Sequence, residues 1–148
     1  MRIVLGYVIA VALMLALGAF TTTQYDLSAL AHVGAPVSMD QRMSMGFSNI
    51  VAMAPIYGGL IAIAFLIGFA VASLTVKPFP LPRPLIYAAA GLVAIATLHI
   101  LTEQVFFGVP IISGTRSLEG LIAQAALGAL AGLAFALISR PKPRSMFA

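Results

Sequence analysis

Residues 118–139 read LEGLIAQAALGALAGLAFALIS, and Glu119 is the only ionisable side chain among them. An α-helix of about 20 apolar residues crosses the roughly 30 Å hydrocarbon core of a bilayer. Three similar stretches precede this one, at about residues 3–20, 50–76 and 85–107. These runs are continuous, not alternating, which favours helices over a β-barrel. We therefore predict an all-α integral membrane four-helix bundle that forms a single domain over residues 1–148.

The composition agrees with this prediction. The 148 residues are 61% hydrophobic and 8% charged, with a mean hydropathy of +1.09, whereas soluble domains carry about 25% charged residues. The chain has no cysteine, which excludes disulfides, iron–sulfur clusters and thiol chemistry. The net charge of +4 comes without a basic face carrying interleaved aromatic residues, so we expect no nucleic-acid partner.

The distribution of Lys and Arg predicts the orientation. Cytoplasmic loops of membrane proteins are enriched in these residues. With the N-terminus inside, only Arg42 and Arg116 fall outside, and six basic residues fall inside: Arg2, Lys77, Arg83, Arg140, Lys142 and Arg144. We expect a multi-pass protein of the inner (cell) membrane, of a bacterial type, with both termini in the cytoplasm.

An alternative is that residues 3–20 form a cleaved signal peptide. Its charged start is Arg2 alone, and the apolar run is longer than the 7–15 residues usual in secretory signals. Cleavage would leave three spans with the N-terminus outside, so we favour the four-span interpretation.

The first outside loop is predicted to contain local structure. Residues 24–31 suit a short helix, and Ser38 followed by Gln41 fits a capping box. Met39, Met43 and Phe47 then recur at helical spacing, which predicts a short amphipathic segment lying at the outer interface and leading into the second span. Further on, Pro55 precedes residues 57–59, a Tyr-Gly-Gly sequence, and is expected to bend or loosen that span.

Small residues form a stripe on the fourth span, four positions apart: Gly120, Gln124, Gly128, Gly132 and Ala136. Close backbone approach between small residues drives helix association in lipid. The stripe is therefore expected to face another helix. That helix can belong to the same chain, to a second copy in a homo-oligomer, or to another membrane protein.

A set of polar residues is predicted at one depth, in the outer third of the bundle: Asn49, His99, Glu103, Arg116, Glu119 and Gln124. Ionisable residues inside spans are costly and suggest function. His99 and Glu103 are four residues apart and so share one helical face.

Three interpretations of this polar cluster remain open. It can be a structural lock, in which Glu103 pairs with Arg116 and His99 bonds Glu103 or Gln124. It can be a proton-accepting site, because histidine titrates near neutral pH. It can also supply metal ligands, either at His99 and Glu103 or as soft donors from the outer loop, namely His32, Met39, Met43 and Met45. We predict no resident metal and no cofactor.

No motif of a known catalytic type occurs, neither Gly-x-Ser-x-Gly nor His-Glu-x-x-His. The expected function is therefore a non-enzymatic membrane subunit or scaffold that packs against other membrane proteins through its small-residue face. The alternative is binding or transport of a small molecule, an ion or a metal through the polar cluster.

Overall fold

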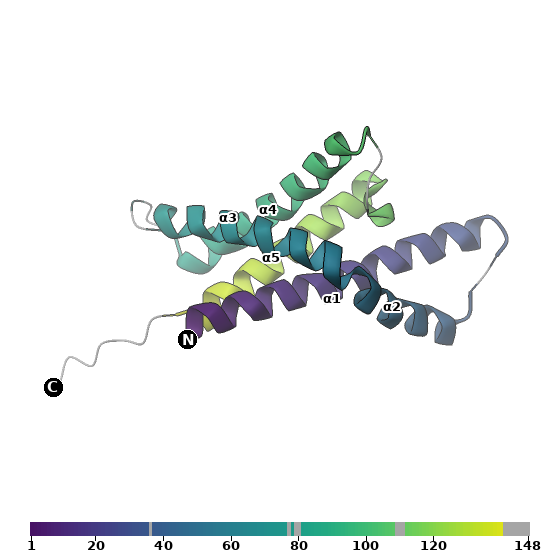
Figure 1. Cartoon of the computed structure of the whole chain (residues 1–148), viewed down its shortest axis with the longest axis horizontal. Helices are drawn as coiled ribbons and strands as arrows, with labels where there is room; N and C mark the ends of the chain where they lie inside the picture. The colour runs from purple at the N-terminus through teal and green to yellow at the C-terminus, as the bar shows by residue number, and fades with distance from the viewer. Residues whose placement is uncertain (36, 77, 79–80, 109–111, 141–148) are drawn as a thin grey trace.

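The computed structural model of the chain describes residues 1–148 except 36, 77, 79–80, 109–111 and 141–148. Its helices, in chain order, are α1 (Arg2–His32), α2 (Met39–Met53), the π-helical turn η1 (Ala54–Gly58), α3 (Gly59–Thr75), α4 (Arg83–Val105), the 3₁₀ turn η2 (Ser113–Thr115) and α5 (Leu118–Ile138). Figure 1 shows the long helices packed side by side along one axis.

Among the residues that the structure describes, four helical stretches are long and apolar enough to cross a membrane. They are α1, the uninterrupted stretch from α2 through η1 to α3, α4 and α5. The prediction of an all-α protein with four helices of membrane-spanning length is confirmed.

α1 continues well past residue 20, where the first span was expected to end. Residues 24–31, predicted as a separate helix, form its last turns. The hydroxyl groups of Thr23 and Ser28 donate to the carbonyl oxygens of Ala19 and Gln24, which satisfies these polar side chains inside a helix. The chain leaves the helix just before Gly34, whose φ of 85° suits glycine.

α2 begins at the predicted capping box. The amide of Gln41 donates to Ser38 Oγ at 3.3 Å, and the amide of Ser38 donates to Gln41 Oε1 at 3.1 Å. The capping box is confirmed. The segment expected to lie along the interface is a helix that runs beside α1 and continues into α3, with Asn49 donating to the Thr23 hydroxyl at 2.7 Å.

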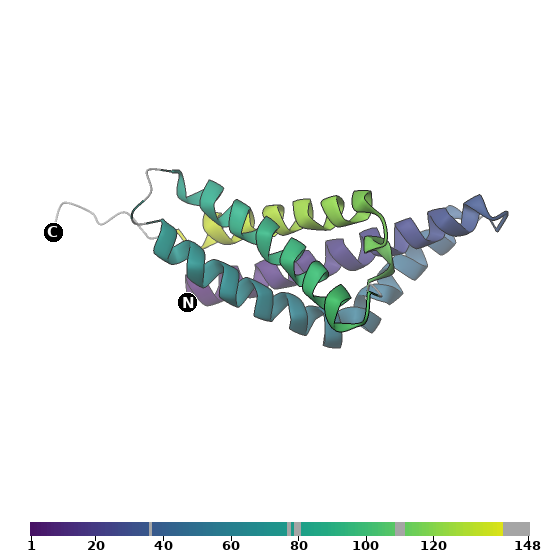
Figure 2. The ribbon, with the colours of Figure 1, turned by 90° about the horizontal axis from the view of Figure 1, so that it is seen from above.

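α1 and α2 form a helical hairpin that extends beyond the other helices (Figures 1 and 2). Close approaches place Gly6 beside Ile138, at the end of α5, and Thr22 beside Gly114, just before its start. The side chain of Asp26 is still bonded to Ser113 of η2, and the six residues from Leu27 to His32 project further by about 9 Å, at 1.5 Å per residue. We call this end of the bundle the hairpin end.

The small-residue stripe of α5 packs inside the chain. All five of its residues are buried. A Cβ atom on Gly128 would lie 2.5 Å from the carbonyl oxygen of Gly91 in α4, and one on Gly132 would overlap the carbonyl oxygen of Tyr87. Helix backbones approach this closely only where side chains are missing. The stripe therefore joins α5 to α4, and at Gly120 to η2.

Arg83 joins α4 to the opposite end of α5, which we call the basic end. Its guanidinium donates to Ala136 O at 2.7 Å and to Ser139 Oγ at 2.8 Å, and lies 4.9 Å from the centre of the Tyr87 ring. Helix C-termini carry carbonyl groups without intrahelical partners and a partial negative charge. Arg83 thus caps α5.

Candidate functional site

Four of the most deeply buried polar side chains come from all four long helical stretches. They are Thr22 of α1, Tyr57 of η1, His99 of α4 and Gln124 of α5, each at most 4% exposed. We call these four residues the polar network. Burying polar groups is costly unless they are hydrogen-bonded, and no buried side-chain nitrogen or oxygen among the described residues lacks a partner.

Gln124 is the centre of the polar network. Its Nε2 donates to Gly18 O and to Thr22 Oγ1, both at 2.9 Å. Its Oε1 accepts from the Tyr57 hydroxyl at 3.1 Å, and the Tyr57 oxygen lies 3.4 Å from His99 Nε2. One amide side chain therefore connects α1 and η1 to α5, and Tyr57 adds α4.

Glycine at position 18 leaves the space that the polar network fills. A Cβ atom there would lie 2.9 Å from Gln124 Oε1 and 3.1 Å from the Tyr57 oxygen. Contacts this short would displace both side chains. Gly18 thus supports the polar network in two ways. It has no side chain that would fill this space, and its carbonyl oxygen accepts a hydrogen bond from Gln124.

The structure brings only two of the six predicted cluster residues together, His99 and Gln124, and joins them through Tyr57 instead of directly. Asn49 lies one step away, bonded to Thr23 next to Thr22. Arg116 and Glu119 are exposed and Glu103 is half-buried. Neither the predicted Glu103–Arg116 ion pair nor a His99–Glu103 hydrogen bond occurs among the described residues.

Two members of the polar network were missed in the sequence. Tyr57 was assigned only to a bend, although a hydroxyl inside an apolar span needs a hydrogen-bond partner. Thr22 lies in a row of three threonines just after residue 20, where the first span was expected to end. Asp26 was also missed; its carboxylate accepts from the Ser113 hydroxyl, which ties the hairpin to η2.

No metal site is assembled in the described part of the chain. No three His, Asp or Glu side chains there are grouped closely enough to hold a metal ion. Of the soft donors considered in the outer loop, Met39, Met43, Met45 and His32 are all exposed.

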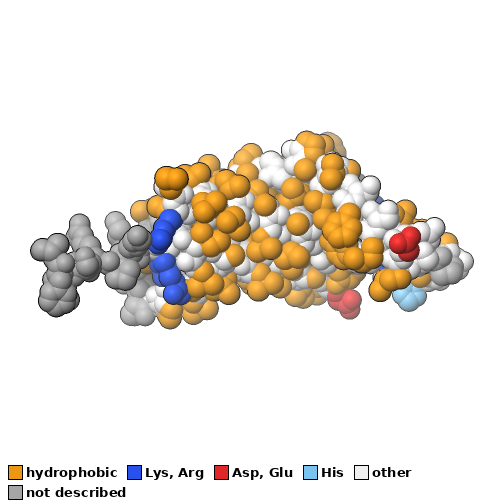
Figure 3. All heavy atoms as spheres, turned by 90° about the horizontal axis from the view of Figure 1, so that it is seen from below, with side chains coloured by type: hydrophobic (Ala, Val, Ile, Leu, Met, Phe, Trp, Pro, Cys, Tyr) orange, Lys and Arg blue, Asp and Glu red, His pale blue; other side chains and the backbone are white. Residues whose placement is uncertain are grey.

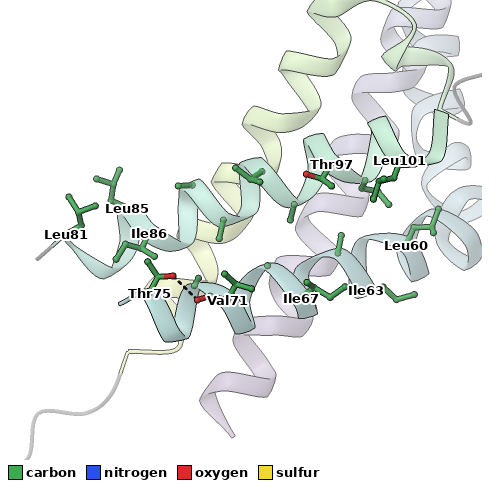
Figure 4. A pocket seen from close by; sticks show the side chains of 18 residues that line it. Leu60, Ile63, Ile67, Val71, Thr75, Leu81, Leu85, Ile86, Thr97 and Leu101 are labelled. Carbon is green, nitrogen blue, oxygen red and sulfur yellow. Dashed lines mark hydrogen bonds between the residues drawn. The ribbon is translucent and has the colours of Figure 1, made fainter. Parts of the chain in front are cut away.

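A large concavity lies elsewhere, between α3 and α4, and we call it the α3–α4 groove (Figure 4). It has a volume of about 770 Å³. Half-buried small residues of both helices, Ala64, Gly68, Ala90 and Ala94, line it. Exposed aliphatic side chains border it, including Ile63, Ile67, Val71, Leu85, Val93 and Leu101. The groove is apolar over most of its length and contains no member of the polar network.

In comparisons with known proteins, the chain matches no family model, no curated protein and no solved structure. Its function is therefore argued from the groove, the polar network and the distribution of charge.

Proposed function

We propose that this chain is a non-enzymatic subunit of an inner-membrane assembly, and that it binds a transmembrane helix of a partner protein in the α3–α4 groove. The observation that carries the proposal is the groove itself, an apolar hollow of about 770 Å³ on two helices of membrane-spanning length. Helices associate in lipid through small residues that allow close backbone approach. The lining residues Ala64, Gly68, Ala90 and Ala94 present such a surface between two aliphatic borders.

This proposal moves the partner-binding surface away from α5. The α5 stripe was the surface expected from the sequence, and its glycines are in contact with α4 and η2 of the same chain. A surface that is already buried is not free to bind a partner. In the groove, by contrast, small residues of two helices lie open together.

The orientation is part of the proposal. On the face shown in Figure 3, Lys and Arg side chains lie at one end, Asp, Glu and His side chains lie at the other, and mostly hydrophobic side chains lie between. Basic residues favour the cytoplasmic side. We propose that the basic end and both termini are cytoplasmic and that the α1–α2 hairpin is on the outer side.

The alternative, a carrier for a small molecule, an ion or a metal, finds less support at the polar cluster. A binding site needs polar groups that face a cavity, and the side chains of His99, Tyr57 and Gln124 face one another. The α3–α4 groove has a volume within the 300–1,000 Å³ range of ligand sites. An apolar ligand or lipid chain in the groove is therefore the second candidate.

Groove-filling variants test the proposal. The protein, extracted in mild detergent from the membrane in which it is made, is weighed by native mass spectrometry as wild type, Ala64→Leu and Ala89→Leu. Both alanines line the groove. Ala70→Leu is the matched control, because Ala70 is exposed on α3 but does not line the groove.

The expected result is a membrane protein bound at fixed stoichiometry, lost in Ala64→Leu and Ala89→Leu and kept in Ala70→Leu. A lipid or small apolar molecule that follows the same pattern would favour the second candidate. Binding that is equal in all three variants would refute the groove as the site.

A further inference from the structure

The second membrane-length stretch contains a weak joint at its centre. Residues Ala54–Gly58 form a π-helical turn between α2 and α3, and such turns interrupt the regular hydrogen bonding of an α-helix. Pro55 has no amide hydrogen to donate. Gly58 and Gly59 follow, and glycine is among the least favourable residues inside a helix.

Packing does not require glycine at the end of this joint. A Cβ atom on Gly59 would meet nothing within 4 Å, and one on Gly58 would make only an ordinary contact of 3.5 Å with Leu15. These positions differ from the glycines of α5, where a Cβ atom would meet backbone. The glycines of the joint therefore weaken the helix without a compensating close approach.

Tyr57 is the only buried residue of the π-helical turn. It is 2% exposed, whereas Ile56 beside it is 70% exposed. Its hydroxyl is also the only side-chain polar group of the turn, and it is bonded to Gln124. Tyr57 is thus the only side chain through which the turn is hydrogen-bonded to the rest of the bundle.

The hydrogen bonds of Tyr57 have a fixed direction. Gln124 must turn its NH₂ group towards Gly18, because a backbone carbonyl only accepts. The amide oxygen of Gln124 therefore faces Tyr57 and accepts its single hydroxyl hydrogen. The Tyr57 oxygen is then left to accept from Nε2–H of His99, which is the longest link at 3.4 Å.

α3 has one other polar connection near the joint. The hydroxyl of Tyr7 in α1 donates to the carbonyl oxygen of Ala62, in the first turn of α3. Further along α3, the buried Phe69 stacks on Phe135 of α5, so a weak joint would let the angle between α2 and the start of α3 change while the rest of α3 stays packed.

We infer that the π-helical turn Ala54–Gly58 is a hinge, and that the hydrogen bonds of Tyr57 to Gln124 and His99 are the latch that holds α2 and α3 at one angle. Release of the latch lets α3 pivot against α2. The inference depends on the joint and the polar network and needs no partner in the groove.

Distance measurements between spin labels test the latch directly. The chain has no native cysteine, so labels can be attached to Ser48→Cys and Leu74→Cys, two exposed positions on either side of the joint. The doubly labelled protein is measured in lipid nanodiscs in three forms: with no further change (here the wild type), with Tyr57→Phe and with Tyr87→Phe. Tyr87→Phe is the matched control, since the Tyr87 hydroxyl makes no hydrogen bond with the described residues and Tyr87 lies in the aromatic cluster near the basic end.

The expected result is one narrow distance distribution in the wild type and in Tyr87→Phe, and a broadened or shifted distribution in Tyr57→Phe. A Tyr57→Phe distribution identical to that of the wild type would overturn the latch. Because no partner is present, this outcome is separate from success or failure of the proposed partner binding.

Hydrogen exchange on the wild type covers the case in which Tyr57→Phe does not fold. We expect the amides of the π-helical turn to exchange about tenfold or more faster than amides near Ile95 in α4, because local opening reflects weaker local structure. Equal protection at both places would overturn the hinge.

Discussion

At the scale of single residues, Arg83 does more than contribute positive charge to the basic end. Its guanidinium donates to Ala136 O and to the hydroxyl of Ser139. It therefore satisfies α5 carbonyls that have no partner within their own helix. From the sequence, Arg83 indicated only which side of the membrane is cytoplasmic. Its contact with Ala136 could not be predicted, because the two residues are far apart in the chain.

Arg83→Met is expected to lower the free energy of unfolding of the purified protein by about 1.5–3 kcal/mol, the usual range for hydrogen bonds to charged groups. Reversible unfolding in mixed detergent micelles measures the change. Arg116→Met is the control, since Arg116 is exposed and exposed positions change stability by about 0.5 kcal/mol or less. Equal losses in the two variants would contradict the cap.

A pair of Gly→Ala changes separates close packing from helix propensity. Gly18→Ala puts a Cβ atom 2.9 Å from Gln124 Oε1, so it should disturb the polar network and cost about 1–3 kcal/mol, the cost of leaving a buried polar group unsatisfied. Gly59→Ala meets no atom and should stabilise the protein by up to about 1 kcal/mol, because alanine favours helix. The same unfolding measurement compares the two variants. If Gly59→Ala were the less stable protein, the close packing at Gly18 and the open space at Gly59 would both be contradicted.

At the scale of elements, the contact between α4 and α5 holds the bundle most closely. Gly91 of α4 faces Gly128, and Tyr87 carbonyl faces Gly132. In lipid such approaches replace the apolar driving force that soluble proteins use, because lipid tails are as apolar as leucine side chains. The contact between α4 and α5 is therefore close only because glycine, which has no side chain, occupies positions 91, 128 and 132.

Gly132→Ala is expected to force α4 and α5 apart. The Cβ atom of the new alanine would overlap the carbonyl oxygen of Tyr87. The atoms that it meets are backbone atoms of α4, which cannot rotate away as a flexible side chain can. We expect a loss of about 3 kcal/mol or more, in the range of severe overpacking, visible as unfolding at lower denaturant. Ala126→Leu, at an exposed position of the same helix, should retain stability. An unaffected Gly132→Ala protein would mean that the helices have room to adjust.

At the scale of the whole molecule, the hairpin and the basic end give the bundle two unlike ends. The hairpin end carries α1 about 9 Å past its contact with η2, and exposes Leu30, Val33, Met39 and Met43. The basic end carries Arg83 against α5. In the proposed orientation, the hairpin extends from the outer surface of the membrane.

Single-cysteine labelling tests the orientation in a chain without native cysteines. In intact spheroplasts, a membrane-impermeant maleimide should label Ser28→Cys, which is exposed on the hairpin, and should spare Leu81→Cys, exposed in the connection before α4. Leu81→Cys should react once the membrane is permeabilised. The opposite pattern would reverse the proposed topology.

Features that depend on neighbouring residues could be predicted from the sequence by itself. The four membrane-length helices, the capping box of Ser38 and Gln41, and the irregular turn at Pro55 are all present in the structure. Each follows from a local cause: the length of an apolar run, a side chain within reach of a free amide, or a missing amide hydrogen.

Features that depend on which helix faces meet were decided by the tertiary structure. In a membrane, side chains that face lipid and side chains that face the core are both apolar, so periodicity does not separate them as it does in water. The α5 stripe therefore had several possible partners in the sequence, and only packing assigned it to α4. The same holds for Tyr57 and Gln124, whose hydrogen bond joins residues 67 positions apart because folding brings η1 within side-chain reach of α5.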